Sequence, residues 1–551
     1  TLSAVSEPGR WRLVQAEGAI DNLRAAFAWS RDHGDVEHAL ELTSMLWPLW
    51  VARGRLREGL AWFDAAFSEG SLESVQPATL ARALADRAGL NAQLGAMNQL
   101  DDARRALEIA RHIGDPALIS RALASCAASA AFSHDIARPY VEEAIELARA
   151  TGDRAMLCQA LAWHGQNAFY GGNPRAGRIA AAEGRDIAED LGDRFVSRAA
   201  RWALAWAATV SGELAAGVGE LRAVAAEATA AGDTTWVFGG LFNGAEAQCR
   251  LGDVEGARMS AHAARDAACD LGSDYDGHFA LLEGYIAVAA GDVDAAETAD
   301  EEAWRELSHE LSHIKINLWR RAAVALAHGD LAAARRWADD AVAGTAGWHR
   351  SVALTTRARV AIAQGDISQA ERDAHAALAA ATEVDALLGV PDTFECIAAL
   401  AHHAGDHPEA ARLFGAADGI RGRTGEVHLH IYQATYDRAI DSLRQAMEQN
   451  DFDIAWAEGT QMSTHEAIAY LQRGRGERKR PDSGWESLTP AEHDVVRLVC
   501  EGLGNKDAAA RLFVSPRTVQ AHLAHIYTKL SINSRVQLMQ EAARRAQTSV
   551  E

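Results

Sequence analysis

Lysine is scarce in this 551-residue sequence. Only four occur, Lys315, Lys479, Lys506 and Lys529, and three of them lie in the last 73 residues. A phosphate-binding loop of the Gly-x-x-x-x-Gly-Lys-Ser/Thr type needs a lysine after its glycines, and none of the four stands in that pattern. Nor do the residues assemble a Ser/His/Asp or Cys/His set of the kind that nucleophilic catalysis requires. The sequence therefore predicts that this chain alone is not an enzyme and carries no cofactor.

Cysteine is equally sparse and shows no Cys-x-x-Cys spacing. The six residues are scattered at Cys126, Cys158, Cys249, Cys269, Cys396 and Cys500. Such scatter favours buried free thiols in a reducing cytoplasm over a zinc site or disulfides. Two histidine groups, His402-His403 and His428 with His430, remain as metal-ligand candidates. No acidic or cysteine residue stands beside them at ligand spacing, so we expect no metal.

Long apolar runs are also missing. No stretch approaches the ~18 residues that a membrane-spanning helix needs, and no signal peptide opens the sequence. We therefore expect a soluble cytoplasmic protein that does not enter a membrane. The sequence starts at Thr1 rather than Met and enters helical sequence directly, so we expect it to be part of a longer protein.

Turn signals, in contrast, recur with a period. Proline is absent from Arg175 to Val390, no strand-like alternation is evident, and glycines followed by Asp, Glu or Ser mark the turns. One series is spaced by 19 or 20 residues: Gly192, Gly212, Gly232, Gly252, Gly272 and Gly291. Others are about 40 apart: Gly114 and Gly152, then Gly329, Gly365 and Gly405. Two antiparallel helices per period of about 40 residues predict an all-α solenoid.

The spacing of small residues supports this solenoid. Alanines seven residues apart follow the turns, as Ala334 and Ala341 follow Gly329-Asp330, and they let neighbouring helices approach closely. The pattern resembles a lengthened tetratricopeptide repeat, and residues 1–470 would hold roughly ten hairpins. Pairs of tryptophans invite two interpretations, a ligand-stacking set or core packing; their helical spacing favours the core. These are Trp47 and Trp50, Trp202 and Trp206, and Trp319 and Trp337.

Charge separates the end of the chain from the rest. Residues 487–551 hold 8 Lys and Arg against 6 Asp and Glu, whereas the residues before them hold 46 against 70. A surface with such an acidic excess repels phosphates. Any contact with nucleic acid therefore belongs to the C-terminal segment. A glycine-containing basic stretch, residues 471–486, precedes that segment and predicts a flexible linker, whose basic residues either follow phosphates or only aid solubility.

The C-terminal segment predicts four short helices. Thr489-Pro490-Ala491-Glu492 has the residues of a capping box and begins the first helix, which Gly502 and Gly504 end. Asn505 is expected to cap a second helix to Leu512, and Ser515 a third that runs to about Leu530. The fourth spans 535–546. Two short helices with a tight turn between them predict a helix-turn-helix, whose second helix can enter the DNA major groove.

The third helix has two distinct faces. Val519, Leu523, Ile526 and Leu530 form the predicted buried stripe, in a domain whose Ala508 and Ala509 allow close packing. Opposite the stripe lie the residues expected to face bases: Arg517, Gln520, Ala521 and Ala524. No Asp or Glu occurs from Ala508 to Gln540, as a phosphate-facing surface requires. The residues expected to hold phosphates are Lys506, Ser515, Thr518, Lys529 and Arg535.

This segment resembles the DNA-binding domain of LuxR-type bacterial transcription regulators. The residues that carry the resemblance are the Leu-Thr-Pro-x-Glu opening, Glu501-Gly502-Leu503, Asn505-Lys506, Leu512-Phe513, Ser515-Pro516, Thr518-Val519, His522, Lys529-Leu530 and Ser534-Arg535. In that family the residue after the Thr-Val pair is often a DNA-contacting lysine; here it is Gln520, which can pair with adenine but cannot neutralise a phosphate. The family's fourth helix commonly forms a dimer contact, which implies a role for Val536, Met539 and Ala543.

Weaker matches extend the resemblance to large ATP-binding LuxR-type regulators. They are residues 21–29, Trp47 to Trp50 with Arg53-Gly54 and Glu58-Gly59, residues 411–417, and residues 455–459. In that group a nucleotide-binding module, sometimes with a nucleotide cyclase, precedes the repeats, so an ATPase or cyclase is expected upstream of this chain.

The sequence thus predicts a DNA-binding transcription regulator. Residues 1–470 would form the repeat domain, residues 471–486 a linker, and residues 487–551 the helix-turn-helix domain. The expected partners are double-stranded DNA, a second copy of the chain on that DNA, and a protein or small effector in the groove of the repeats. The alternative is a repeat scaffold for protein assembly whose C-terminal segment serves as a docking domain.

Overall fold

The computed structural model describes most of the chain. The described residues are 15–68, 72–94, 100–130, 133–271, 276–307, 315–474, 495–496, 498–500, 503–512, 519–520, 523, 526–527, 529–530 and 532–548. Among them the regular elements are helices, and none is a strand, so the predicted all-α class is confirmed. The chain divides into two compact units, the repeat unit Thr1–Thr464 and the C-terminal unit His465–Glu551.

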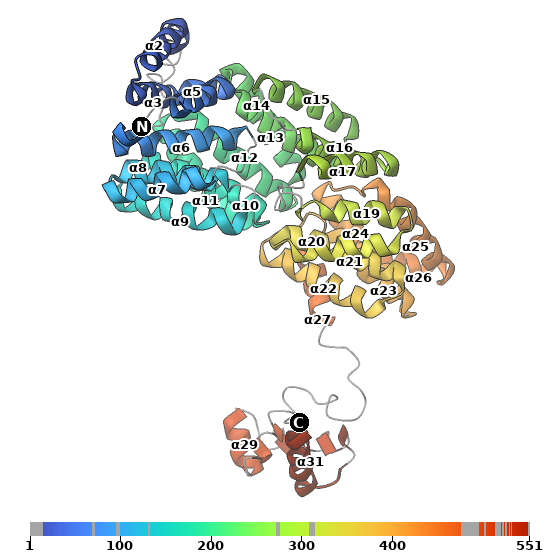
Figure 1. The fold of residues 1–551 in the computed structure, drawn as a ribbon. Coiled ribbons are helices and arrows are strands. Elements are labelled where there is room, and N and C mark those ends of the chain that lie inside the picture. Colours follow the sequence, from blue (N-terminus) through green and yellow to red (C-terminus); the bar gives the residue numbers. More distant parts are fainter. Residues whose placement is uncertain are drawn as a thin grey trace. The chain divides into compact units, whose positions relative to one another are not determined.

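Helices follow one another through the repeat unit with short turns (Figure 1). Those up to residue 271 are α2 (Ile20–Asp32), α3 (Val36–Met45), α4 (Trp47–Ala52), α5 (Leu56–Ser68), η1 (Leu72–Ser74), α6 (Pro77–Gln93), α7 (Leu100–Ile113), α8 (Pro116–Ser129), α9 (His134–Thr151), α10 (Arg154–Tyr170), α11 (Pro174–Leu191), α12 (Arg194–Val210), α13 (Leu214–Ala231), α14 (Thr234–Arg250) and α15 (Val254–Leu271). Those after it are α16 (Asp276–Ala290), α17 (Val293–Leu307), α19 (Leu318–Ala327), α20 (Leu331–Ala343), α21 (Gly347–Gln364), α22 (Ile367–Glu383), α23 (Val390–His403), α24 (His407–Thr424), η2 (His430–Tyr432), α25 (Gln433–Gln445) and α26 (Gln449–Gln461).

From α6 to α24 these helices pair as hairpins, and each hairpin packs on the next. The pairs among the described residues run from α6 with α7 to α23 with α24. The first helix of each hairpin also contacts the first helix of the next, as α10 contacts α12 and α12 contacts α14. The first helices therefore form an inner layer and the second helices an outer one, which is the stacked-hairpin architecture that the turn spacing predicts.

The Gly-Asp pairs work at these turns as their chemistry suggests. Gly192 ends α11 in the left-handed conformation, with φ of 70°, which glycine adopts without a steric penalty. The next residue, Asp193, then caps α12 by accepting a hydrogen bond from the Val196 N–H at 3.1 Å. Positive φ recurs at the described glycines of both predicted series; Gly272 lies outside the described residues.

Small residues hold the layers together. Ala334, Ala341, Ala370 and Ala377 are all buried, with at most 1% of their surface exposed. Because an alanine side chain extends only one methyl group, the helix backbones approach closely at these positions. The predicted role of the alanines spaced seven apart is confirmed.

Repeats that are far apart in the sequence contact one another in the repeat unit. The ends of the inner helices accept hydrogen bonds from residues much later in the chain: the Phe169 carbonyl from His349 Nε2 at 2.8 Å, the Val210 carbonyl from Leu387 N at 2.9 Å, and the Arg250 carbonyl from Val427 N at 2.9 Å. The two partners of such a contact lie 176 to 180 residues apart in the sequence. Earlier in the chain, Arg53 Nη1 donates to the Ala231 carbonyl across 178 residues. This constant separation is one turn of a superhelix whose successive turns touch.

The last helices of the repeat unit meet through glycine. Gly415 on α24 lies against the backbone of Trp456, and Gly459 on α26 lies against the backbone of Arg412 and Ala416. A side chain at either position would occupy the space of the facing backbone. The glycines therefore set the distance at which α26 packs on α24.

The C-terminal unit contains α27 (Thr464–Gly474), α29 (Asn505–Leu512) and α31 (Arg535–Thr548). Its core joins Val495, Val496, Leu498 and Val499 to Ala508 and Ala509 on α29 and to Leu538 on α31. The remaining core residues, Val519, Leu523 and Ile526, are helical and buried. Among the described residues of this unit, ten apolar side chains thus form one small core between several short helices.

Candidate functional site

The structure describes the predicted buried stripe of the recognition segment and one residue of the opposite face, Gln520. Val519, Leu523 and Ile526 are buried, Leu530 is partly buried against them, and Gln520 is exposed. Each of these residues is itself helical, and the Gln520 side chain faces solvent next to the buried Val519. The Gln520 amide can both donate and accept hydrogen bonds.

The lysines of the C-terminal unit differ in exposure. Lys506, on the first turn of α29, is exposed, and Lys529 is half-buried. Asn505 is the first residue of α29 rather than its cap, because the Gly504 carbonyl already accepts the first helical bond, from Ala508 N at 2.9 Å. The expectation that Asn505 caps this helix is therefore wrong by one position.

Asn505 has another function in the structure. Its side-chain oxygen accepts a hydrogen bond from Arg535 Nη1 at 2.9 Å, and Arg535 Nη2 donates to the Leu503 carbonyl. Arg535 begins α31, so its guanidinium ties the start of α31 to the start of α29. This tie could not be deduced from the helical pattern, since it joins the starts of two helices 30 residues apart.

The other candidate residues differ in how far the structure describes them. Met539 is exposed on α31, as a dimer contact would need. Val536 and Ala543 belong to the same helix, but their side chains lie outside the described part of the chain. Five further candidates fall outside the described residues: Ser515, Arg517, Thr518, Ala521 and Ala524.

The repeat unit contains a cavity of about 290 Å³. Most of its lining residues come from the inner helices α10, α12, α14, α16, α19 and α21. Many of them are aromatic, among them Trp163, Phe169, Trp202, Trp206, Trp236 and Trp319. Trp202 and Trp206 are buried, as core packing predicts, yet they also face this cavity. Helical spacing alone does not distinguish a filled core from a hollow one.

Polar residues lie on one face of α14 in the cavity wall. Asn243, Glu246 and Arg250 are spaced three and four residues apart, so they line up along the helix. Trp202 Nε1 donates to Asn243 Oδ1 at 3.0 Å, and Asn243 Nδ2 donates to Glu246 Oε2 at 3.2 Å. Burial raises the pKa of the Glu246 carboxyl, because a charge is poorly solvated in such surroundings.

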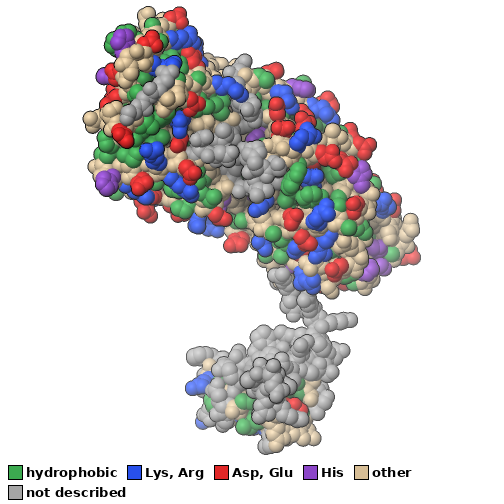
Figure 2. All heavy atoms as spheres, in the orientation of Figure 1, with side chains coloured by type: hydrophobic (Ala, Val, Ile, Leu, Met, Phe, Trp, Pro, Cys, Tyr) green, Lys and Arg blue, Asp and Glu red, His purple; other side chains and the backbone are tan. Residues whose placement is uncertain are grey.

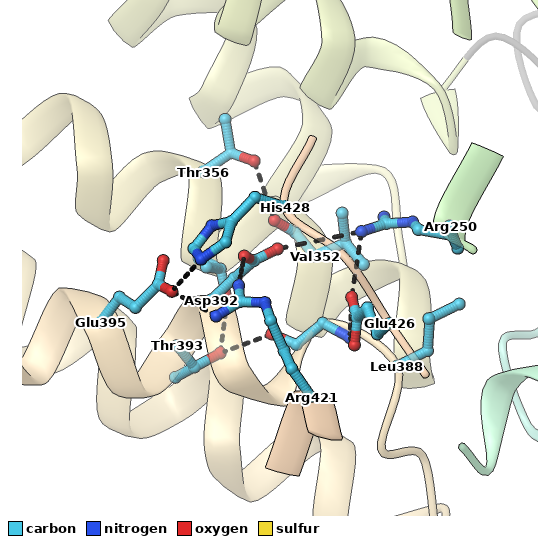
Figure 3. Close-up of polar contacts among 12 residues, drawn as sticks. Arg250, Val352, Thr356, Leu388, Asp392, Thr393, Glu395, Arg421, Glu426 and His428 are labelled. Carbon is cyan, nitrogen blue, oxygen red and sulfur yellow. Dashed lines mark hydrogen bonds and ion pairs between the residues drawn. The ribbon is translucent and has the colours of Figure 1, made fainter. Parts of the chain in front are cut away.

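A buried network of ion pairs (Figure 3) includes Arg250, which also lines the cavity. Arg250 Nη1 is 3.3 Å from Glu426 Oε1 and 3.9 Å from Asp392 Oδ2. Arg421 Nη2 pairs with Asp392 Oδ1 at 2.6 Å, and its Nη1 pairs with Glu395. Arg359 joins the same acids, 3.1 Å from Asp392 Oδ1. The network therefore connects α14 with α21, α23, α24 and the segment after α24.

His428 belongs to this network, and its acidic neighbours make it a candidate metal ligand. Its Nε2 lies 3.3 Å from Glu395 Oε1, and the two residues together with Asp392 have a geometry that could hold an ion. Sequence spacing indicated no acidic partner for His428; the fold supplies two, from α23. However, Arg421 and Arg359 already pair with both carboxylates, and their charges would repel a cation. The group is therefore better described as an ion-pair network than as a metal centre.

The other histidine pair is also explained by local contacts. His402 Nδ1 lies 3.1 Å from His407 Nδ1, and its Nε2 lies 3.0 Å from Ser442 Oγ. His403 follows it on the last turn of α23.

Acidic and basic side chains are interspersed on the face of the repeat unit that Figure 2 shows. This mixture gives DNA phosphates no uniformly basic surface on that face. None of the described helices combines the length and the apolar content that crossing a bilayer requires.

Comparison with known proteins identifies the C-terminal segment. Residues 486–542 match the family described as "Bacterial regulatory proteins, luxR family". The "Oxygen regulatory protein NreC" of Staphylococcus epidermidis is 43% identical over 58 residues, which are 10% of this chain and 27% of that protein. The chain therefore carries a LuxR-type helix-turn-helix domain at its C-terminus.

Longer similarity joins the whole chain to mycobacterial proteins. The "Putative HTH-type transcriptional regulator Rv0890c" of Mycobacterium tuberculosis (strain ATCC 25618 / H37Rv) is 47% identical over 557 residues. A protein of the same description from Mycobacterium bovis is equally similar. The match covers 100% of this chain and 63% of each relative, so the chain spans less than two thirds of their length.

Among solved structures, the chain matches the one described as "Crystal Structure of the Yeast Tom70". The similarity has a TM-score of 0.29 and 14% sequence identity, and it covers 85% of this chain and 97% of that one.

Proposed function

We propose that the LuxR-type helix-turn-helix domain makes this chain the DNA-binding and control portion of a bacterial transcription regulator. The family match of residues 486–542 supports this function together with the exposure of Gln520 beside three core residues. A segment that buries Val519, Leu523 and Ile526 and exposes Gln520 presents one side to the domain and the other to a groove of DNA.

In this proposal the candidate side chains divide by chemistry. Those that meet base edges are Arg517, Gln520, Ala521 and Ala524. Those that hold phosphates are Lys506, Ser515, Thr518, Lys529 and Arg535. The amide of Gln520 pairs with adenine, the alanines contact thymine methyl groups, and the cationic residues supply affinity that does not depend on sequence.

The domain acts as a pair on DNA. Met539, exposed on α31, would contact a second copy together with Val536 and Ala543, and each copy would read one half-site. A dimer doubles the contacts, which a single short recognition helix with two alanines needs for useful affinity.

The repeats control the domain. Arg250 lies both in the cavity wall and in the ion-pair network that holds residues 425–430. Those residues lead directly into η2, α25 and α26 and then toward the linker. A partner or effector in the cavity would thus act on a structure that continues into the DNA-binding segment.

The domain organisation proposed is 1–470 for the repeats, 471–486 for the linker and 487–551 for the DNA-binding domain, with α27 extending over the first four residues of the linker. We place the protein in the bacterial cytoplasm, where a transcription regulator meets DNA. The resemblance to large ATP-binding regulators leads us to propose that an ATPase or cyclase module accompanies these residues in the longer protein.

Selection of bound sequences from a random pool of DNA duplexes tests the function. The chain should enrich a motif made of two half-sites. Enrichment equal to that of the unselected pool would refute a sequence-reading regulator and favour the alternative, a repeat scaffold with a docking domain. Salt separates the two further, because affinity that depends on phosphate contacts falls steeply as salt concentration rises.

A further inference from the structure

The cavity of the repeat unit has the composition of a small-molecule site. Its volume of about 290 Å³ is near the lower end of the range found for such sites, roughly 300–1,000 Å³. Its walls are rich in tryptophan and phenylalanine, and the rings come from helices about 40 residues apart, such as Trp202 on α12 and Trp236 on α14. A cavity of this size fits a compact molecule with one or two rings.

Glu246 brings a carboxylate into these aromatic walls. It is half-buried and lines the cavity, so the surface it keeps belongs to the cavity wall. Its carboxylate accepts a hydrogen bond from a neutral group, the Asn243 amide, at 3.2 Å. Trp202 holds that amide in turn, so the carboxylate is fixed in position from one side.

The arginines nearest to Glu246 already have acids of their own. Arg250 pairs with Glu426 at 3.3 Å and bonds to the Tyr285 hydroxyl at 2.5 Å. Arg320 pairs with Asp300 at 3.2 Å. Both arginines interact with Glu246 through their charge, but neither is its ion-pair partner among the described residues. The wall therefore presents a carboxyl group without an ion-pair partner among the described residues, next to aromatic faces.

We propose that this cavity binds an organic cation, a small molecule whose ammonium group pairs with Glu246 while its flat apolar body lies among the tryptophans. Aromatic faces attract cations through the ring quadrupole, most strongly where water is excluded. An ammonium group would also place a positive charge beside the Glu246 carboxylate, which stabilises the ionised form of a poorly solvated acid. An anion would instead be repelled by the Glu246 carboxylate, and Arg250 beside it already pairs with Glu426.

This ligand assignment rests on the proposed function only in making the cation the effector of the regulator. Binding itself needs no DNA, so the two proposals fail separately.

Calorimetric titration of the full chain with three indoles of similar size tests the assignment. Tryptamine carries an ammonium group, tryptophol a neutral hydroxyl and indole-3-propionate a carboxylate. Tryptamine should bind at least tenfold more tightly than tryptophol, and indole-3-propionate should bind most weakly. The tightest binding by indole-3-propionate, or no binding of tryptamine at millimolar concentration to the folded chain, would overturn the proposal.

Matched variants locate the site. Glu246→Gln keeps the size of the side chain and should weaken tryptamine at least tenfold while it leaves tryptophol within about threefold. Glu255→Gln removes the same charge from α15, where the Glu255 side chain is 87% exposed, and should leave all three affinities unchanged. Trp206→Leu should weaken tryptamine and tryptophol together. Circular dichroism establishes that each variant is folded.

A tryptamine preference that survives Glu246→Gln would overturn the site. The duplex selection is run on the same preparation with and without tryptamine. Motif enrichment without tryptamine binding refutes the cation site and leaves the regulator standing, whereas tryptamine binding without enrichment supports the site and refutes the regulator.

Discussion

Gln520 and Lys506 offer DNA different chemistry although both are exposed in the C-terminal unit. Gln520→Ala removes an amide that can form two hydrogen bonds to adenine, so discrimination at one base position should fall by about 1–3 kcal/mol. Lys506→Ala removes a charge that reads no base, so it should weaken all sequences alike. Duplex selection and salt titration of the affinity measure the two effects.

The salt dependence provides the control. Lys506→Ala should lower the slope of log affinity against log salt by about 0.9, whereas Gln520→Ala should leave the slope unchanged. Lys315→Ala removes an exposed lysine from the repeat unit and should change neither quantity. Equal loss of slope in Lys315→Ala would contradict the assignment of phosphate contact to the C-terminal unit.

His349 makes the repeat unit sensitive to acid. Burial lowers the pKa of His349 to about 4, although its bond to the Phe169 carbonyl acts in the opposite direction. The unfolded chain, with an ordinary pKa near 6.5, therefore binds the proton more readily between pH 6.5 and 4, and stability is lost as the pH falls through that window. At pH 5.5 this single residue costs about 1.4 kcal/mol relative to pH 7.5.

His349→Gln keeps an N–H donor but cannot bind the proton. Its free energy of unfolding should thus fall by about 1.4 kcal/mol less than that of the wild type between pH 7.5 and 5.5. Urea unfolding at the two pH values measures the difference. His262→Gln, at an exposed position of α15, should retain the wild-type loss, and an equal loss in His349→Gln would disprove the role of His349.

Residues on a single helix were predictable. Val519, Leu523 and Ile526 follow the 3.6-residue period, and burial is the direct consequence of that period. Glu246 was not predictable as a cavity residue, nor were Asp392 and Glu395 as partners of His428. Their surroundings arise from helices that only the tertiary structure brings together.

At the scale of elements, the contact of α26 with α24 depends on glycine. A Cβ at Gly459 would overlap the Arg412 carbonyl and lie 2.7 Å from Ala416 N. Gly459→Ala should therefore force the helices apart and destabilise the repeat unit by about 1–3 kcal/mol. Urea unfolding, with hydrogen exchange at the amides of α26, measures the cost.

Gly422→Ala is the matched control, because a Cβ there meets nothing within 4 Å. It should leave the stability unchanged or raise it by up to about 1 kcal/mol, since alanine favours the helix. Similar losses in both variants would show that the close approach of the two helices is unimportant.

The helices and turns of the repeats followed from local sequence. Gly-Asp pairs combine a residue suited to a helix end with one suited to a helix start, so each turn is specified within a few residues. The cap assigned to Asn505 was off by one residue, because Gly504 supplies the first carbonyl. Such boundaries depend on single hydrogen bonds that the sequence pattern does not resolve.

At the scale of the whole repeat unit, contact between superhelical turns should add to stability. A Cβ at Gly172 would lie 2.7 Å from the Ala346 carbonyl and 2.9 Å from Trp348 N, both on the next turn. Gly172→Ala should therefore cost more than the ~1–2 kcal/mol of a left-handed alanine, by a further ~1–3 kcal/mol. Thermal and urea unfolding of the full chain measure the total.

Gly192→Ala measures the cost of the left-handed backbone conformation alone. Gly192 has a similar φ, +70° against +64°, but a Cβ there meets nothing within 4 Å. It should cost only the ~1–2 kcal/mol of the left-handed conformation. Equal costs in the two variants would mean that the turns do not support one another. The repeat period predicted neighbouring hairpins only; contact 176 to 180 residues away depends on the accumulated rotation between hairpins.

Because these contacts join residues at a constant separation of 176 to 180 positions, they fix the number of residues in one superhelical turn. In an open array, evolution adds or removes single repeats at little cost, because each repeat touches only its neighbours. Here the loss of one hairpin between Gly172 and Val427 would put every downstream residue opposite the wrong partner on the adjacent turn. Insertions and deletions in related genes should therefore accumulate in the turns between helices, while the number of hairpins in this region stays fixed.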